Sequence, residues 1–353
     1  MIIKKASPFY IGGEFDYNRK TYYNKNSKIG KKISLLEKNF SINGISSFYK
    51  ILKELKLKNL KKIYIPSYIC SHLILPIKKA KLHYEFYNIH NDFSSNFIPE
   101  KNTGLLLMHY FGKNNPSLEF YQKQSENNFY LIEDATHSYM NKNFDLLKKN
   151  FLFFSLRKHG SLGAGGWSNS RYLIDKSAVD ENNFLEKNIQ IRQEKFLMLQ
   201  SNTYWKKEET FINHFKILNS IFSKKISLNI IKKKKLNLTF NYNWEFSIKK
   251  RIENWNTLNG IVKGKFKKYH DNVSDECVPL GYIIYLKNRD KIINKLKKKG
   301  IFTSVHWSLP KEINSKNFVL ENKISNTILT IPIDQRYGKK EMEYIGETLY
   351  KVT

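Results

Sequence analysis

The chain has 353 residues, 41% of them hydrophobic and 14% aromatic, so it can bury a sizeable core in one or two domains. This composition excludes a disordered chain, and no apolar run approaches the length of a membrane span. The first ten residues lack the apolar stretch of a signal peptide, and we therefore expect a cytoplasmic protein with no membrane partner.

The formal net charge of +30 invites comparison with nucleic-acid-binding proteins. However, nearly all basic residues are lysines spread along the chain, whereas base and phosphate recognition depends strongly on arginine. We therefore expect no nucleic-acid partner, although a positive surface could attract an anionic small substrate. Cys70 and Cys277 are far apart and the nine histidines are scattered, so neither a metal site nor a disulfide framework is expected.

From about residue 40, patterns typical of helices and strands alternate. The predicted helices are 46–60, 71–80 and 116–128, and the predicted strands are 62–69, 81–89, 103–112, 129–135 and 151–156. The run at 103–112 is continuously apolar, as in a strand that is covered on both faces. This alternation predicts an α/β fold with a mostly parallel, doubly wound sheet.

After residue 183 the pattern changes to long helical periodicity, at 183–200 and 204–222. The C-terminal part returns to shorter patterns. They predict a strand at 277–287, a helix at 289–300, a strand and turn at 301–310, a strand and loop at 328–338, and a helix at 339–351. We expect three parts: an N-terminal arm (1–40), a large α/β domain with a helical connector (41–235), and a small C-terminal α+β domain (236–353). The arm is expected to pack near the small domain.

Two strand ends carry the candidate chemistry. Asp134 lies at the end of the strand at 129–135 and Lys158 follows the next strand, so both side chains are expected at the carboxyl edge of the sheet, where ligands bind. A buried carboxylate and a buried lysine each need a partner. Pyridoxal phosphate (PLP) uses both, because it binds a lysine amine and needs a carboxylate to keep its pyridine nitrogen protonated. Its phosphate requires backbone N–H groups at a helix start, which the sequence offers at 43–46.

The chain resembles the DegT/DnrJ/EryC1/StrS sugar aminotransferases, a group of fold-type I PLP-dependent enzymes. The resemblance runs from about residue 43 to the C-terminus, in the ordered blocks NGISSFYKIL, IYIPSYIC, LLLMHYFG, LIEDATHS, FFSLRKHGSLGAGGW, GIFTSVHWSLP and LTIPIDQRYGKKEMEYI. It implies a large domain with a mostly parallel, seven-stranded type of sheet, a smaller α+β domain, and a homodimer in which each site is built from two subunits.

Carried over by position, the resemblance implies that Lys158 is the Schiff-base lysine and proton shuttle. Asp134 would pair with the pyridine nitrogen, and His137 would lie near the phenolic oxygen of the ring. The residues implied at the phosphate are Gly44, Ile45, Ser46 and Ser155.

Other positions are less specific. Either Tyr68 or Cys70 would cover the ring, and the spacing does not decide between them. The candidates for anionic or hydroxyl groups of the substrate are Arg157, His306 and Arg336. The family takes an asparagine from the neighbouring subunit, and Asn241 and Asn243 lie in roughly the corresponding region.

The chain also departs from the family pattern. Ala164 stands where the family commonly has an acid before Gly-Gly, Ile45 replaces a threonine and Asn43 replaces a serine. The phosphate site would therefore lose side-chain hydroxyls and keep its backbone donors.

The resemblance implies an aminotransferase that takes the amino group of glutamate and passes it to a keto sugar linked to a nucleotide, in surface-polysaccharide or related sugar biosynthesis. A first alternative is a PLP-dependent dehydratase, or an aminotransferase acting on another small substrate. Family dehydratases have histidine in place of the lysine, whereas here Lys158 is present and His159 is only its neighbour. A second alternative, of another class, is an inactive protein of this fold that binds an anionic polymer.

Overall fold

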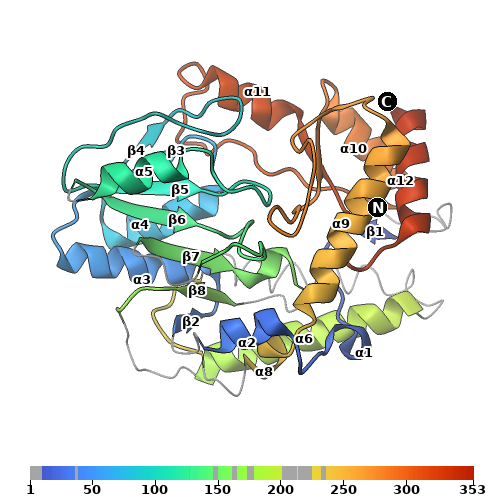
Figure 1. Cartoon of the computed structure of the whole chain (residues 1–353), viewed down its shortest axis with the longest axis horizontal. Helices are drawn as coiled ribbons and strands as arrows, with labels where there is room; N and C mark the ends of the chain where they lie inside the picture. The colour runs from blue at the N-terminus through green and yellow to red at the C-terminus, as the bar shows by residue number, and fades with distance from the viewer. Residues whose placement is uncertain are drawn as a thin grey trace.

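A seven-stranded sheet forms the centre of the large domain (Figure 1). The computed structural model describes residues 10–35, 39–126, 128–145, 150–160, 165–172, 179–200, 213, 225–231 and 236–353. The sheet order is β2–β8–β7–β6–β5–β3–β4. The strands are β2 (Phe40–Ser41), β3 (Lys62–Pro66), β4 (His83–Tyr87), β5 (Gly104–Met108), β6 (Tyr130–Asp134), β7 (Phe151–Ser155) and β8 (Gly166–Ser168).

Five neighbouring strands, β3 to β7, run parallel, while β8 is antiparallel to both β7 and β2. The mostly parallel α/β sheet predicted from the sequence is therefore confirmed. The strand predicted at 62–69 ends at Pro66, and the strands β2 and β8 at one end of the sheet have no counterpart among the predictions. With two and three residues, they are too short to show an alternating pattern.

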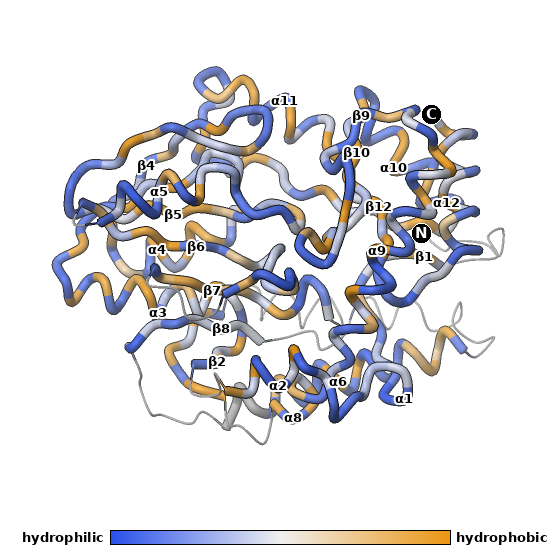
Figure 2. The backbone as a smooth tube through the Cα atoms, viewed as in Figure 1, coloured by the Kyte–Doolittle hydropathy of each residue, from blue (hydrophilic) through white to orange (hydrophobic). Residues whose placement is uncertain are grey.

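The helices of the large domain begin and end close to their predicted positions. They are α3 (Gly44–Leu57), α4 (Ile74–Ala80) and α5 (Leu118–Ser125). The apolar side of α3 faces the sheet, where Phe48 stacks on Phe153 of β7 with ring centroids 4.8 Å apart. Asn43 caps the helix, because its side-chain oxygen accepts a hydrogen bond from the Ser46 N–H at 2.9 Å. Hydrophobic residues are concentrated along β5 and β6 at the centre of this domain (Figure 2).

The small domain combines a three-stranded antiparallel sheet with helices. The sheet has the order β12–β10–β9, with β9 (Lys267–Lys268), β10 (Tyr282–Tyr285) and β12 (Ile328–Ile331). The helices are α9 (Trp244–Val262), α10 (Arg289–Lys298), α11 (Val319–Thr327) and α12 (Lys339–Val352). The long helix α9 rises along the junction between the domains and packs beside α12 (Figure 1).

The sequence patterns predicted neither α9 nor α11. The buried side of α9 includes Arg251 and Asn254 between its apolar residues, so the helix lacks a continuous apolar stripe. The Asn254 side chain donates to three backbone carbonyls, those of Ile333, Asp334 and Tyr337. These buried polar groups are satisfied by the loop after β12, which a periodicity argument could not anticipate.

The beginning of the N-terminal arm lies against the small domain, as expected, and its later part also packs on the large domain. Its strand β1 (Ile11–Gly12) pairs in parallel with β11 (Ile301–Phe302), the only strand formed within the predicted strand and turn at 301–310. The arm continues through α1 (Arg19–Tyr22) and α2 (Lys28–Ser34), which lie near α6 (Val179–Gln200) and α8 (Asn237–Phe240) (Figure 1). The helix predicted at 183–200 is part of α6. The one predicted at 204–222 lies outside the described residues, apart from residue 213.

None of the described helices is both long and apolar enough to cross a membrane. Within the same residues, no group of three or more His, Cys, Asp or Glu side chains could hold a metal ion.

Two glycines offer a matched test of the packing between α9 and α12. A methyl group on Gly346 of α12 would lie 2.4 Å from Ile261 Cγ2, whereas one on Gly260 of α9 would meet no atom within 4 Å. We expect Gly346→Ala to lower the free energy of unfolding by about 1–3 kcal/mol. Gly260→Ala should raise it by about 0.5–1 kcal/mol, because alanine is the better helix former. Urea unfolding of both variants measures this, and equal effects would contradict the packing described here.

Candidate active site

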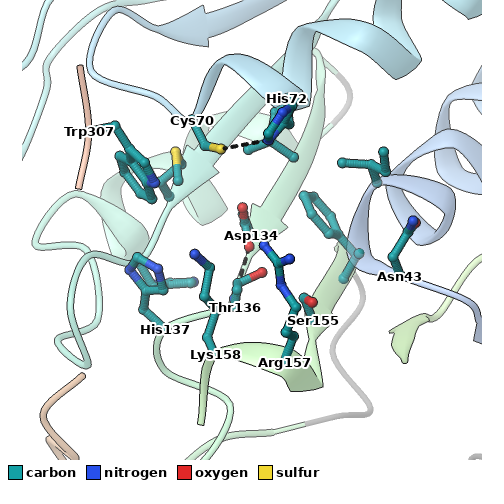
Figure 3. A pocket seen from close by; sticks show the side chains of 16 residues that line it. Asn43, Cys70, His72, Asp134, Thr136, His137, Ser155, Arg157, Lys158 and Trp307 are labelled. Carbon is teal, nitrogen blue, oxygen red and sulfur yellow. Dashed lines mark hydrogen bonds between the residues drawn. The ribbon is translucent and has the colours of Figure 1, made fainter. Parts of the chain in front are cut away.

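Asp134 and Lys158 lie together in one pocket. Asp134 is the last residue of β6, and Lys158 ends a short 3₁₀ turn that follows β7. Both side chains line a pocket at the carboxyl edge of the sheet, beside the start of α3, and Figure 3 shows them pointing into the same space. Adjacent parallel strands therefore bring a carboxylate and an amine together, as the sequence predicted.

Burial shifts the protonation of both groups. Asp134 is only 4% exposed, and burial raises the pKa of its carboxyl group, although the Thr136 N–H donates to its Oδ1 at 2.9 Å. Burial also lowers the pKa of Lys158, and the positive charge of Arg157 lowers it further. An uncharged amine is a nucleophile. A carboxyl group in this position is stabilised as an anion if a ligand brings a positive charge to it.

His137 is fixed as a hydrogen-bond donor toward the pocket. Its Nδ1 accepts a hydrogen bond from the Phe111 N–H at 3.2 Å, and a backbone N–H can only donate. Burial lowers the pKa of His137 well below its usual range, and nearby His306 adds to this effect, so the ring is neutral. A neutral ring with unprotonated Nδ1 carries its proton on Nε2. Among the described residues, this N–H has no hydrogen-bond acceptor.

An aromatic side chain from the small domain covers part of the pocket. Trp307 lines it and stacks on His137, with ring centroids 5.3 Å apart and an interplanar angle of 20°. Phe111 stacks on His137 at 5.7 Å and 21°. These contacts hold the plane of the imidazole. Trp307 was not among the predicted site residues. The only sequence feature that pointed to it is its place as an aromatic residue in the block GIFTSVHWSLP.

The structure distinguishes between the two candidates for covering the ring. Tyr68 is fully buried outside the pocket, and its hydroxyl donates to the His306 carbonyl and accepts from the Trp307 N–H at 2.8 Å. Cys70 lines the pocket instead, with its Sγ 3.9 Å from Nδ1 of His72. Tyr68 therefore acts on the pocket through the backbone that carries Trp307.

The start of α3 lies close to the end of β7. A methyl group on Gly44 would be 2.9 Å from Ser155 Cβ, so only glycine fits without a shift. Gly44, Ile45 and Ser155 all line the pocket. Ser46 does not, because its N–H is bonded to Asn43 and its Oγ accepts from the Ser227 N–H at 3.0 Å. The two hydrogen bonds turn Ser46 away from the position that the resemblance implied. Ala164 lies outside the described residues.

A second cavity of about 290 Å³ adjoins the first. Arg157 and Lys158 line both cavities, and His306 and Arg336 line the second. Nδ1 of His306 is 2.9 Å from Thr330 Oγ1. The three candidate substrate residues therefore gather around one space beside Lys158.

Arg336 differs from the other two candidates, because its guanidinium is fully used within the chain. It binds both carboxylate oxygens of Asp334, at 2.7 and 2.9 Å, and donates to the carbonyls of Gly12, Gly13 and Glu14. All five N–H donors of the guanidinium are thus occupied. Arg336 therefore links the arm to the small domain through these hydrogen bonds, and none of its N–H groups is left for a substrate.

Asn241 and Asn243 make their hydrogen bonds within their own chain. Asn243 caps α9 by accepting from the Phe246 N–H at 3.3 Å, and Asn241 donates to the Asn237 carbonyl at 2.9 Å. Whether either residue contributes to a neighbouring subunit stays a prediction.

Solved structures of aminotransferases match this chain over nearly its whole length. Spr1654 of Streptococcus pneumoniae, which is assigned as a sugar aminotransferase, is 14% identical, with a TM-score of 0.65 and 98% of both chains covered. The sugar aminotransferase CalS13 of Micromonospora echinospora is 10% identical, with a TM-score of 0.58, 96% of this chain covered and 93% of the other. A DegT/DnrJ/EryC1/StrS aminotransferase of Brucella abortus is 12% identical, with a TM-score of 0.60 and coverages of 94% and 92%.

The chain has the fold of these aminotransferases. No protein-family model matches it, and no curated protein matches it in sequence. The large domain with a mostly parallel α/β sheet that the resemblance implied is therefore confirmed, and the structural neighbours share this fold.

The tie between Tyr68 and the backbone at Trp307 can be tested directly. In Tyr68→Phe the His306 carbonyl and the Trp307 N–H, both partly buried, lose the hydroxyl of a fully buried side chain, so we expect the free energy of unfolding to fall by about 1–3 kcal/mol. Urea unfolding measures the loss. Tyr350→Phe is the control, because the hydroxyl of this 42% exposed tyrosine bonds a carbonyl at 3.1 Å near solvent. A loss no larger than in this control would contradict the role of the tie.

Proposed function

We propose that the chain is a PLP-dependent aminotransferase that transfers the amino group of glutamate to a keto sugar linked to a nucleotide. The observation that carries this proposal is the pairing of Asp134 and Lys158 in one buried pocket beside the start of α3. The fold agrees with it. Spr1654 has been solved in PLP and PMP forms, and DesV of S. venezuelae in complex with a ketimine intermediate. Surface-polysaccharide or related sugar biosynthesis is the proposed setting, with a cytoplasmic homodimer as the working form.

The residues of the pocket fit PLP. Gly44 leaves room where a side chain would fill the space beside Ser155, so the free backbone at the start of α3 can approach a phosphate. Nε2–H of His137 is an unused donor for the phenolic oxygen. Asp134, disfavoured as an anion by burial, would be stabilised by a protonated pyridine nitrogen. When bound, PLP withdraws electrons from the bonds at the amine-bearing carbon of the substrate.

Lys158 has two tasks in this proposal. Its uncharged amine binds the cofactor covalently, and after release by the substrate's amine it moves a proton at the amine-bearing carbon. Trp307 and the His137 ring beside it limit the access of water to this space. The adjoining cavity, which shares Lys158 and Arg157, would hold the remainder of the substrate.

The competing functions are less well supported by the pocket. His159 is fully buried and lines neither cavity, so it does not stand in for the histidine of the family's dehydratases. A protein that merely binds anionic polymers would have no need of a lysine that shares a pocket with a buried aspartate.

Two variants test the proposal. Purified protein with PLP should show a visible absorbance band that Lys158→Ala abolishes and that Lys113→Ala, an exposed control, retains. Asp134→Asn should weaken cofactor binding roughly 10- to 100-fold, because a charge-assisted hydrogen bond is lost. Glutamate should bleach the band, and a mass-spectrometric screen of nucleotide-linked keto sugars should then reveal an aminated product. A colourless protein that retains DNA in a salt-sensitive way would contradict the proposal.

The pH dependence of cofactor attachment follows from the environment of Lys158. Burial favours the uncharged amine, so the pKa lies below the ordinary lysine value of 10.5. The amine is therefore reactive at a lower pH than in a free lysine, and reactivity is lost as the pH falls through this lowered pKa. Stopped-flow measurement of the attachment rate should give a midpoint below that of a lysine peptide. A midpoint at or above that of the peptide would contradict the burial argument.

A further inference from the structure

The N-terminal arm forms one wall of the second cavity. Residues 12–15 line it, together with side chains of the small domain and with Lys158, which the two cavities share. Strand β1 pairs with only two residues of β11, so other contacts must hold the rest of the segment. Gly12 has a φ of +93°, and a methyl group on it would lie 1.9 Å from the Phe302 carbonyl oxygen, so only glycine fits there. The width of the cavity therefore depends on where residues 12–15 are held.

Arg336 contacts every one of these four arm residues. Its two terminal nitrogens donate to three consecutive carbonyls, those of Gly12 at 3.4 Å, Gly13 at 3.3 Å and Glu14 at 3.0 Å. The central carbon of its guanidinium lies 4.5 Å from the centroid of the Phe15 ring, within the range of a cation–π contact. The arm residues that line the cavity are therefore the ones that Arg336 holds.

The loop after β12 fixes Arg336 and adds a second hold on the arm. Asp334 accepts hydrogen bonds from Nε of Arg336 at 2.7 Å and from Nη2 at 2.9 Å, and this bidentate pair fixes the plane of the guanidinium. Burial alone would raise the pKa of Asp334, but the charge of Arg336 outweighs it and lowers the pKa, so the pair is ionised at neutral pH. Tyr337 follows in the loop, and its hydroxyl accepts a hydrogen bond from the Gly12 N–H at 2.6 Å.

Helix α6 holds the same segment from a different element. Arg192 donates to the Phe15 carbonyl at 2.7 Å, and Lys195 donates to the Glu14 carbonyl. These contacts reach only the second half of residues 12–15. Within the part of the chain that the structure describes, the hydrogen bonds of Gly12 and Gly13 come from the small domain instead. The first half of the wall therefore depends on β11 and on the loop after β12.

We propose that Arg336 and Tyr337 are positioning residues, which hold residues 12–15 of the arm as a wall of the second cavity and thereby set the affinity for the part of the substrate that binds there. The inference rests on the proposed function and refines it, because it gives Arg336 a role through the arm in place of the substrate contact that the resemblance implied. If the arm is in place in only a fraction of the molecules, the apparent affinity falls by that fraction. Residues 12–15 do not line the pocket of Asp134, so the reaction of bound substrate should change little.

Arg336→Lys gives a direct test in the holoenzyme. Lysine keeps the positive charge beside Asp334, but its ammonium group has three donors at one point and cannot reproduce the planar fork of five. We expect the glutamate concentration that gives half of the maximal bleaching rate to rise roughly three- to tenfold. The rate at saturating glutamate should stay the same. Stopped-flow absorbance at a series of glutamate concentrations measures both quantities.

Arg289→Lys is the matched control. Arg289 of α10 is also buried, lies 2.9 Å from the carboxylate of Asp290 and donates to the carbonyls of Ser325 and Ile328. It lines neither cavity. Its replacement removes the same kind of contact elsewhere in the small domain and should leave the half-saturating concentration unchanged. An equal rise in both variants, or no rise in Arg336→Lys, would overturn the inference.

Tyr337→Phe keeps the inference testable if Arg336→Lys does not fold. It removes the acceptor of the Gly12 N–H and leaves Arg336 and Asp334 unaltered, and Tyr337 does not itself line the cavity. One hydrogen bond is lost, so the half-saturating concentration should rise roughly two- to fivefold. An unchanged value would overturn the inference.

A second readout needs neither cofactor nor amino donor. In hydrogen–deuterium exchange, the amides of residues 11–17 should exchange faster in Arg336→Lys and in Tyr337→Phe than in the wild type, and at the wild-type rate in Arg289→Lys. Unaltered exchange in the first two variants would also overturn the inference. The failures can be told apart, because a wild-type chain that never attaches PLP contradicts the proposed function and this inference together. A holoenzyme that glutamate bleaches normally in every variant contradicts only the role of Arg336 and Tyr337.

Discussion

The placement of the buried Asp134 and the half-buried Lys158 in one pocket is the constraint on which the rest of the site depends. Each group alone is disfavoured in its charged form, and burial shifts the two pKa values toward the neutral species. A protein gains nothing in stability by burying two such groups without a close partner. The arrangement becomes favourable when a ligand carries a positive charge to the carboxylate and an electrophile to the amine. PLP is a ligand that meets both requirements.

The residues around Asp134 and Lys158 restrict the orientation and the tautomer of the other side chains in the pocket. The Phe111 N–H fixes the tautomer of His137, and the neighbouring rings of Phe111 and Trp307 restrict its orientation. One of these rings, Trp307, belongs to the small domain, and Tyr68 of the large domain anchors its backbone. The pocket and the adjoining cavity are thus assembled from the large domain, the small domain and the arm, although Asp134 ends β6 and Lys158 follows the adjacent strand β7.

The sequence could predict the parts of this structure that depend on periodicity and order along the chain. Long apolar runs gave β5, β6 and β7, and the placement of polar groups after them brought Asp134 and Lys158 to one edge. The sequence could not predict contacts between residues that are far apart along the chain. Arg336 was expected near a substrate, and only the fold brings Asp334 and the arm carbonyls to all of its donors. Similarly, Ser46 shares the helix start with Gly44, but the chain at Ser227 determines which way its hydroxyl points.

The most direct test of the central claim is to identify which lysine holds the cofactor. Borohydride reduction fixes PLP on the amine that bears it, and digestion with mass spectrometry then locates the modified lysine along the chain. The account predicts one stoichiometric adduct, on Lys158, which Asp134→Asn reduces under limiting cofactor. Substoichiometric adducts scattered over exposed lysines, with Lys158 unmodified, would contradict it.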